Sequence, residues 1–225
     1  MYIVEPGLDP AVLIKNYGVM CKYVLNVFSC YKILTIIFIR TLGISPNEDV
    51  LEIIRGDDAP KQISVDADLG PLGVRALTES FSGHDGKSYK LINTIRLWRS
   101  NIGEEGCQTL ADLLRTCSSF GMNLCFLQLL DCRVNDLGCQ AIGKSLQSGV
   151  NKTLLTLNLD HNEMIGTIGL KYLTEGLCTN AVLKRLSLRY CNIDSGGGKS
   201  IKNLLNGYST QLEELCLKVR PKWLK

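Results

Sequence analysis

Residues 154–164 read Leu-Leu-Thr-Leu-Asn-Leu-Asp-His-Asn-Glu-Met, with apolar side chains at positions one, four, six and eleven and an asparagine at position nine. The same spacing, with serine or cysteine also found at position nine, recurs along the chain. Further copies occupy Ile92–Ile102, Leu124–Val134 and Leu183–Ile193, a cut-off copy occupies Leu212–Leu217, and a weaker one occupies Ile63–Leu69. The full copies and the cut-off copy start 29 to 32 residues apart. Self-similarity at such a period predicts a solenoid of stacked repeats.

Each repeat has a second half with a different apolar spacing. After Gly138, for example, come Ala141, Ile142 and Leu146, and similar stretches follow Gly106, Gly169 and Gly197. The apolar period therefore changes from about two to about 3.6 residues within each unit, which predicts a strand, a turn and a helix. A helix between consecutive strands makes the strands parallel. Because helices are wider than strands (about 10 Å against about 4.8 Å), the stack is predicted to curve with its strands inside.

These units resemble leucine-rich repeats of the ribonuclease-inhibitor type. Residues 100–106 (Ser-Asn-Ile-Gly-Glu-Glu-Gly) and 134–138 (Val-Asn-Asp-Leu-Gly) are similar to the strand-exit turn of that subtype, and the long helical half distinguishes it from shorter repeats. The resemblance covers residues 63–217, although the fourth repeat carries one extra residue before Gly169. It implies an α/β leucine-rich-repeat solenoid, with a curved parallel sheet on the concave side and helices on the convex side. The usual work of that family is protein binding.

Two regions are expected along the chain. Residues 63–225 form the repeat domain, with about five repeats and a truncated last strand, and residues 1–62 form an α-helical N-terminal region. Residues 23–39 are largely apolar. The length of this segment is at the lower end of the range that can span a membrane, and the charged Lys32 near its middle disfavours insertion. Three interpretations stay open: a helix that caps the first repeat, a membrane anchor, or a segment absent from the working protein. In the last case residues 17–23 and 40–47 join into an amphipathic helix.

Composition narrows the class of protein. A chain of 225 residues with 45% hydrophobic content supports one continuous core, and a net charge of +3 without a basic run does not indicate nucleic-acid binding. Six of the ten cysteines recur with the repeat, as small buried residues do: Cys132 and Cys191 stand at position nine, Cys107 and Cys139 follow the turn glycines, and Cys117 and Cys178 stand at helix ends. With no CxxC motif and only two histidines, no metal site or cofactor is predicted. We therefore expect no disulfide and a reducing compartment, the cytoplasm, with the nucleus as an alternative.

Two stretches imitate catalytic motifs. Residues 196–200 (Gly-Gly-Gly-Lys-Ser) end like a phosphate-binding loop, but the residue five positions before Gly198 is Ile193, a core position of the repeat. His161 beside Asp160 suggests acid–base chemistry, but no serine or cysteine is placed to complete a triad, and a solvated surface pair is expected. The sequence therefore predicts a non-catalytic protein.

The side chains between and after the strand leucines point away from the core. Trp98, Tyr190 and the nearby arginines are of the types enriched in binding hot spots. The predicted partner-binding surface on the concave face comprises Arg96, Trp98, Arg99, Leu130, Asp131, Asp160, His161, Arg189 and Tyr190. We expect a protein partner of unknown identity. The alternative is a membrane-anchored adaptor that uses residues 23–39 as a transmembrane or membrane-surface helix.

The C-terminal end is expected to be uncapped. No helix follows the strand at residues 212–217, so Leu204, Leu205 and one edge of that strand are predicted to lack a neighbour. This pattern predicts a frayed end and either a longer natural solenoid or self-association at this end.

Overall fold

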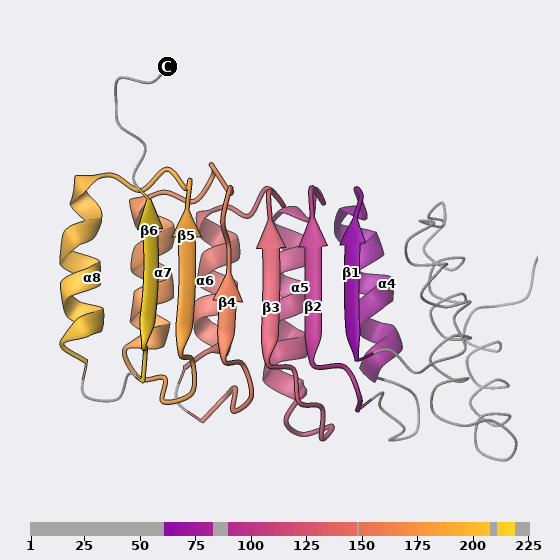
Figure 1. Cartoon of the computed structure of the whole chain (residues 1–225). Coiled ribbons are helices and arrows are strands. Elements are labelled where there is room, and N and C mark those ends of the chain that lie inside the picture. The colour runs from indigo at the N-terminus through magenta and orange to yellow at the C-terminus, as the bar shows by residue number, and fades with distance from the viewer. Residues whose placement is uncertain (1–60, 83–89, 148, 208–210, 219–225) are drawn as a thin grey trace, which may run out of the picture.

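The computed structural model describes residues 61–82, 90–147, 149–207 and 211–218. They form one parallel sheet with strands in sequence order: β1 (Gln62–Asp66), β2 (Thr94–Trp98), β3 (Phe126–Leu130), β4 (Thr156–Asn158), β5 (Arg185–Arg189) and β6 (Glu214–Lys218). The intervening helices are α4 (Gly70–Ser82), α5 (Gly103–Thr116), α6 (Asp136–Ser145), α7 (Thr167–Leu177), the 3-10 turn η1 (Ser195–Gly197) and α8 (Gly198–Leu205). In Figure 1 the strands stand side by side and the helices lie behind them. The predicted solenoid of strand–helix repeats is confirmed.

The strands pair in the register that the repeated leucines predict. Ile95 pairs with Leu127, Leu127 with Leu157, and Leu157 with Leu186. The side chains of Ile95, Leu127, Leu157 and Leu186 are 0–1% exposed. They face the helices and belong to the same buried cluster as helix residues such as Leu114. Burying a leucine or isoleucine side chain stabilises a fold by about 1.5–3 kcal/mol. The apolar row that runs across all repeats is therefore the main source of stability.

A second row of contacts fixes each strand exit to the preceding repeat. The residue at position nine donates a hydrogen bond to a main-chain carbonyl one repeat earlier in every full copy. These bonds run from Ser100 Oγ to Ala67 O (2.5 Å), Cys132 Sγ to Leu97 O (3.3 Å), Asn162 Nδ2 to Leu129 O (2.7 Å) and Cys191 Sγ to Leu159 O (3.4 Å). Serine, cysteine and asparagine are short side chains that carry a donor, which explains why these types stand there.

Two buried asparagines join the repeats at the opposite end of the helices. Asn151 donates from Nδ2 to Leu114 O (2.8 Å) and accepts from the Leu154 amide at Oδ1 (2.9 Å). Asn180 does the same one repeat later, with the carbonyl of Leu146 and the amide of Leu183. Each asparagine side chain thus forms hydrogen bonds with a carbonyl at a helix end and with a main-chain amide just before the next strand. Neither asparagine is among the repeat positions predicted from the sequence.

The extra residue of the fourth repeat changes which side chain fills the core. Met164 was expected at the buried eleventh position, but it is 57% exposed, and Ile165 is fully buried in its place. The Ile165 amide donates to Asn162 O, so the inserted residue is absorbed in a tight turn after the strand. The prediction for Met164 is wrong because a tight turn can hold the added residue without moving either neighbouring element.

Several predictions lie wholly or partly outside the described residues. These include the helical N-terminal region up to residue 60, the apolar segment 23–39 and the last residues, 219–225. Among the described helices, none combines the length and apolarity needed to cross a membrane. Within the described C-terminal repeat, Leu205 is 60% exposed as expected. Leu204 is fully buried, because the helix turns it into the core cluster, against which Leu215 and Leu217 of β6 also pack.

The described cysteines are free thiols, and several lie deep in the core. Burial raises the pKa of Cys107, Cys132 and Cys191 to about 12. A thiol with such a pKa stays neutral in the folded protein at neutral pH, and it packs as a small apolar group.

The first prediction concerns the apolar row. Leu157→Ala and Leu186→Ala each remove a buried leucine from a central strand, and each should lower the free energy of unfolding by about 2–5 kcal/mol. Leu137, on α6, is 47% exposed, so Leu137→Ala is the matched control and should change it by less than about 0.5 kcal/mol. Urea denaturation measures all three, and wild-type-like midpoints for both core variants would contradict the register.

The second prediction tests the close approach of α6 and α7. A Cβ added at Gly176 would lie 2.1 Å from the carbonyl oxygen of Gly143, a main-chain atom that cannot move aside cheaply. Gly176→Ala should therefore destabilise the protein by about 1–3 kcal/mol, although alanine favours helices. At Gly198 an added Cβ meets nothing within 4 Å. Gly198→Ala should be neutral or stabilising by up to about 1 kcal/mol, and equal thermal shifts for the two variants would contradict this packing.

The third prediction follows from the buried thiols. Their pKa is about 12 when folded and about 8.5 when unfolded, so their contribution to stability is complete below about pH 8.5 and is lost as the pH rises toward 12. Cys132→Ser with Cys191→Ser keeps a short donor, as at Ser100, and removes two titrating groups. Between pH 9 and 11 the wild type should lose about 1.4 kcal/mol per pH unit more than the variant for each thiol removed. Parallel pH profiles of urea unfolding would show that these thiols are not buried.

Candidate functional site

The strand exits turn sharply, and this turn sets the rim of the concave face, the sheet surface that faces away from the helices. Arg99, Asp131, His161 and Tyr190 occupy equivalent positions, and each has a positive φ of 52–62°. This left-handed conformation costs non-glycine residues about 1–2 kcal/mol and is retained where the surrounding structure requires it. It redirects the chain from the sheet toward the next helix. The side chains of these four predicted site residues therefore line one edge of the concave face.

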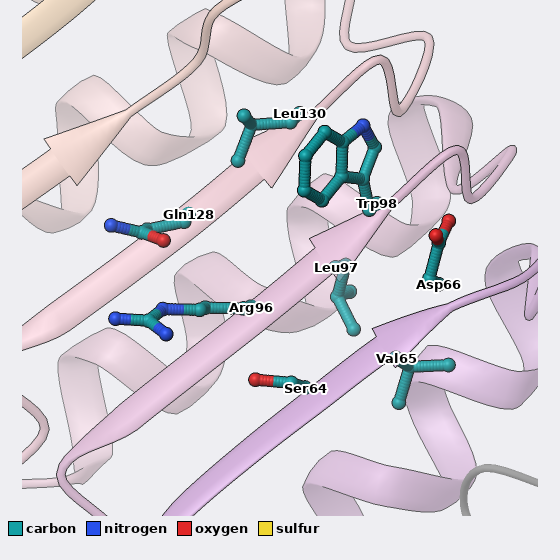
Figure 2. A pocket seen from close by; sticks show the side chains of 8 residues that line it. All are labelled: Ser64, Val65, Asp66, Arg96, Leu97, Trp98, Gln128 and Leu130. Atoms are coloured by element: carbon teal, nitrogen blue, oxygen red, sulfur yellow. The ribbon is translucent and has the colours of Figure 1, made fainter.

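The first three strands form an open depression on this face with a volume of about 450 Å³. We call it the apolar depression, and it is lined by Ser64, Val65, Asp66, Arg96, Leu97, Trp98, Gln128 and Leu130. Trp98 pairs in register with Leu130, and Figure 2 shows the indole lying toward that leucine. Trp98 is 53% exposed, whereas Leu130 is only partly exposed. The predicted exposure of Trp98 agrees with the structure, and Leu130 is more buried than expected because the indole lies beside it.

Two predicted site arginines lie close to the apolar depression. Arg96 pairs in register with Gln128, and in Figure 2 its guanidinium lies next to the Gln128 amide. Arg99 makes a bidentate ion pair with Asp66, with Nε–Oδ1 and Nη2–Oδ2 distances of 2.8 and 2.6 Å. The hydrogen bond from Arg99 lowers the pKa of the Asp66 carboxyl. Because both partners are exposed, the pair adds little to stability, but it neutralises the charge at this edge of the depression.

The exits of β4 and β5 and the end of β6 bring three side chains together. The rings of His161 and Tyr190 stack with centroids 4.4 Å apart and an interplanar angle of 19°. Lys218 Nζ lies 4.6 Å from the Tyr190 ring centroid and donates to the Tyr190 hydroxyl at 2.8 Å. Stacking and the cation–π contact hold Tyr190 in one orientation. Tyr190 was predicted to be exposed, and these neighbours leave it partly exposed.

The last two strands carry most of the positive charge of the concave face. Arg185 and Arg189 on β5 and Lys218 on β6 are all exposed, and we call these three residues the basic end. A smaller hollow of about 190 Å³ lies among Arg185, Arg189 and their neighbours. Glu214 on β6 pairs in register with Arg185, and the exposed Glu213 before it makes an ion pair with Lys184 (Nζ–Oε1 2.6 Å). Arg185 and Lys218 were not in the predicted site, although their outward positions in the strand pattern identify them.

Asp160 does not belong to the exposed surface that the sequence predicted. It is only 9% exposed, and its Oδ1 accepts hydrogen bonds from Ser187 Oγ (2.6 Å) and the Arg189 amide (2.7 Å). β4 ends at Asn158, so the chain beyond it turns Asp160 toward β5. The carboxylate therefore joins two repeats. The expected solvated pair of Asp160 with His161 is wrong, because the imidazole stacks on Tyr190 instead.

The glycine-rich stretch has a packing role in the structure. A Cβ at Gly197 would lie 2.8 Å from Leu170 Cδ2 and 2.9 Å from Ile193 Cγ2, so this glycine allows η1 to sit on the core. Within the described ranges, no group of three or more histidine, cysteine or acidic side chains is arranged to hold a metal ion.

Comparisons with known proteins agree with the repeat architecture. The family described as "Leucine Rich repeat" matches residues 150–173 and 179–202, and each match covers one strand and part of the helix after it. The chain is 34% identical over 131 residues to the mouse (Mus musculus) "NACHT, LRR and PYD domains-containing protein 14", covering 58% of this chain and 12% of that protein. It is 30% identical over 122 residues to the mouse "NACHT, LRR and PYD domains-containing protein 12", covering 53% and 11%.

Among solved structures, "Leiomodin-1 Actin-Binding Site 2 (ABS2)" aligns with a TM-score of 0.41 and 17% identity, over 79% of this chain and 83% of that chain. The chain spans only about one eighth of the length of the curated relatives it matches. The family matches fall on consecutive strand–helix units of the observed sheet, and both relatives are named for such repeats. This chain therefore carries leucine-rich repeats at the matched residues, and its strand–helix units resemble the ribonuclease-inhibitor-like subtype.

Proposed function

We propose that this chain is a non-catalytic protein-binding module that holds its partner on the concave face. Leucine-rich repeats generally mediate protein binding. The observation that carries the proposal for this chain is the apolar depression, where the large indole of Trp98 remains 53% exposed over an open hollow of about 450 Å³. A half-exposed tryptophan in a hollow is a typical anchor of a protein interface.

The rest of the face supports the same function. Tyr190 is held by His161 and Lys218, so it would lose little conformational freedom when a partner binds. Arg189, directly before it, and Arg185, at the start of the same strand, belong to the type most enriched at interfaces, together with tryptophan and tyrosine. The strands fix the spacing of these side chains before any partner arrives. A preorganised face of this kind favours recognition of one defined surface.

The chemistry of the remaining groups favours binding over catalysis. Asp160 joins two repeats by accepting hydrogen bonds from Ser187 Oγ and the Arg189 amide, and His161 stacks on Tyr190, so both side chains are engaged in structural contacts. The buried cysteines with a raised pKa are poor nucleophiles. We infer a reducing location, the cytoplasm, from these free thiols.

The fourth prediction tests the concave face directly. The full chain, wild type or Trp98→Ala with Tyr190→Ala, is immobilised, and proteins captured from a cell lysate are quantified by mass spectrometry. At least one captured protein should be lost with the variant. Binding of that purified partner should weaken by about 30-fold or more, because truncation of an interface hot spot costs about 2 kcal/mol or more.

The matched control removes exposed apolar side chains from the helices. Ile168→Ala with Leu205→Ala changes residues that are 58% and 60% exposed on α7 and α8, and it should leave capture and affinity unchanged. Circular dichroism and thermal melting establish that each variant is folded. A partner that binds the Trp98–Tyr190 variant as tightly as the wild type, but is lost with the control, would place the interface on the helices and reject the proposal.

A further inference from the structure

We propose that the occupant of the concave face is an acidic protein segment that places an apolar side chain in the apolar depression and carboxylates at the basic end. This inference rests on the proposed function, because it names the kind of partner that the same face takes. The three strands of the depression and the two strands of the basic end offer different chemistry. One extended segment that crosses the strands can reach both.

The apolar half of the site is the hollow around Trp98 and Leu130. These two side chains are register partners on β2 and β3, and the main chain of Val65 and Leu97 contributes to the floor. Asp66 and Arg99 at its edge neutralise each other, and Arg96 lines the side of the depression next to Gln128. An apolar side chain that enters from the solvent covers the exposed indole. Burial of apolar surface makes the favourable contribution to the free energy of binding at the apolar depression.

The basic half attracts negative charge. Arg185 lies opposite Glu214 in the register, the exposed Glu213 pairs with Lys184, and the Asp160 carboxylate is buried and already accepts two hydrogen bonds. The positive charge that a partner can reach is therefore carried mainly by Arg189 and Lys218, which are exposed register partners at the ends of β5 and β6. Complementary charge speeds association and selects the partner, and guanidinium groups bind carboxylates through paired hydrogen bonds.

The outward strand positions between the two halves are polar and uncharged, and the exposed Asp131 lies on the rim just after β3. Gln128, Asn158 and Ser187 are register partners across β3, β4 and β5, and each is partly buried. Such side chains suit the amide groups of an extended chain better than they suit bulky apolar or charged side chains. The middle of the segment therefore contributes main chain and small residues.

Strand spacing fixes the distance between anchor and acids. From β2 to β5 there are three strand steps and to β6 four, which at about 4.8 Å per step gives about 14–19 Å. An extended chain advances about 3.3 Å per residue, so this distance corresponds to about four to six residues. The structure thus specifies a segment with an apolar residue and, four to six residues away, two or more aspartates or glutamates.

The fifth prediction is tested with a displayed library of random twelve-residue peptides, selected on the immobilised full chain. Selected peptides should be enriched in an apolar residue with acids four to six positions from it, in one chain direction. Synthetic copies are then measured by fluorescence polarisation. Replacing their acids by glutamine should weaken binding by about tenfold or more, and added salt should weaken it further.

Two variants separate the two halves of the site. Arg189→Glu with Lys218→Glu should bind the selected peptides about tenfold or more weakly, and should regain binding when the peptide acids are changed to lysine. Trp98→Ala should weaken binding while the preference for acids over glutamines stays. The control Lys144→Glu with Lys199→Glu carries the same charge change on exposed residues of α6 and α8, and it should bind like the wild type. Circular dichroism confirms that each variant is folded.

The outcomes distinguish this inference from the proposed function. Peptides that depend on Trp98 but show no preference for acids overturn the acidic segment and leave the concave interface standing. Peptides that bind without regard to Trp98, Arg189 or Lys218 overturn both. No selection above background overturns the acidic segment. A twelve-nucleotide single-stranded DNA that binds more tightly than the best peptide, and is lost with Arg189→Glu and Lys218→Glu, assigns the basic end to nucleic acid instead.

Discussion

The hydrogen bond from each strand exit to the repeat before it is the contact on which the remaining structure depends. The chain turns there in a left-handed conformation, so the ordinary ladder of the sheet stops and buried carbonyls need another donor. Leaving such a group unpaired costs about 1–3 kcal/mol. Asn162 meets this need most fully, because its Nδ2 donates to Leu129 O and Leu159 O while its Oδ1 accepts from the amides of Cys132 and Val134. Each repeat is thereby aligned on its neighbour.

Alignment of the repeats also produces the concave face. Once successive strands are in register, the outward side chains of the strands stand in rows, with Trp98 beside Leu130 and Arg189 beside Lys218. Since none of the described helices covers this surface, its chemistry can differ between repeats without disturbing the core. The result is a face that is apolar at β1–β3 and positively charged at β5–β6. The repeated spacing of the leucines supports the surface, and the positions between them differ from one repeat to the next.

The predictions for Met164 and Asp160 are wrong for local physical reasons. The apolar period placed Met164 in the core, but it could not show that the extra residue is absorbed in the turn before Ile165. The alternation of the strand placed Asp160 outside. Its burial depends on the early end of β4 and on the donors Ser187 Oγ and Arg189 N, which come from the next repeat. These outcomes depend on the lengths of neighbouring elements, which a pattern within one repeat does not contain.

Asn151 and Asn180 are a different case. Each stands three residues before the first leucine of its repeat, so alignment of the repeats with one another reveals the pair. Their partners, the carbonyls of Leu114 and Leu146, are identified only when the helix ends are seen beside the following turn. The recurrence of these asparagines can be read from the sequence, but the hydrogen bonds that explain it are visible only in the structure.

The sequence by itself determined the repeat period, the order of strand and helix, the parallel sheet and the buried apolar row. These features depend on the spacing of apolar residues within one repeat, and that spacing follows directly from the geometry of strands and helices. Only the tertiary structure decided which outward residues are free and which are paired. The Arg99–Asp66 ion pair and the Tyr190–Lys218 contact join residues 33 and 28 positions apart. Such contacts depend on how each helix and turn carries one strand exit beside the next, and on side-chain orientations that no spacing rule specifies.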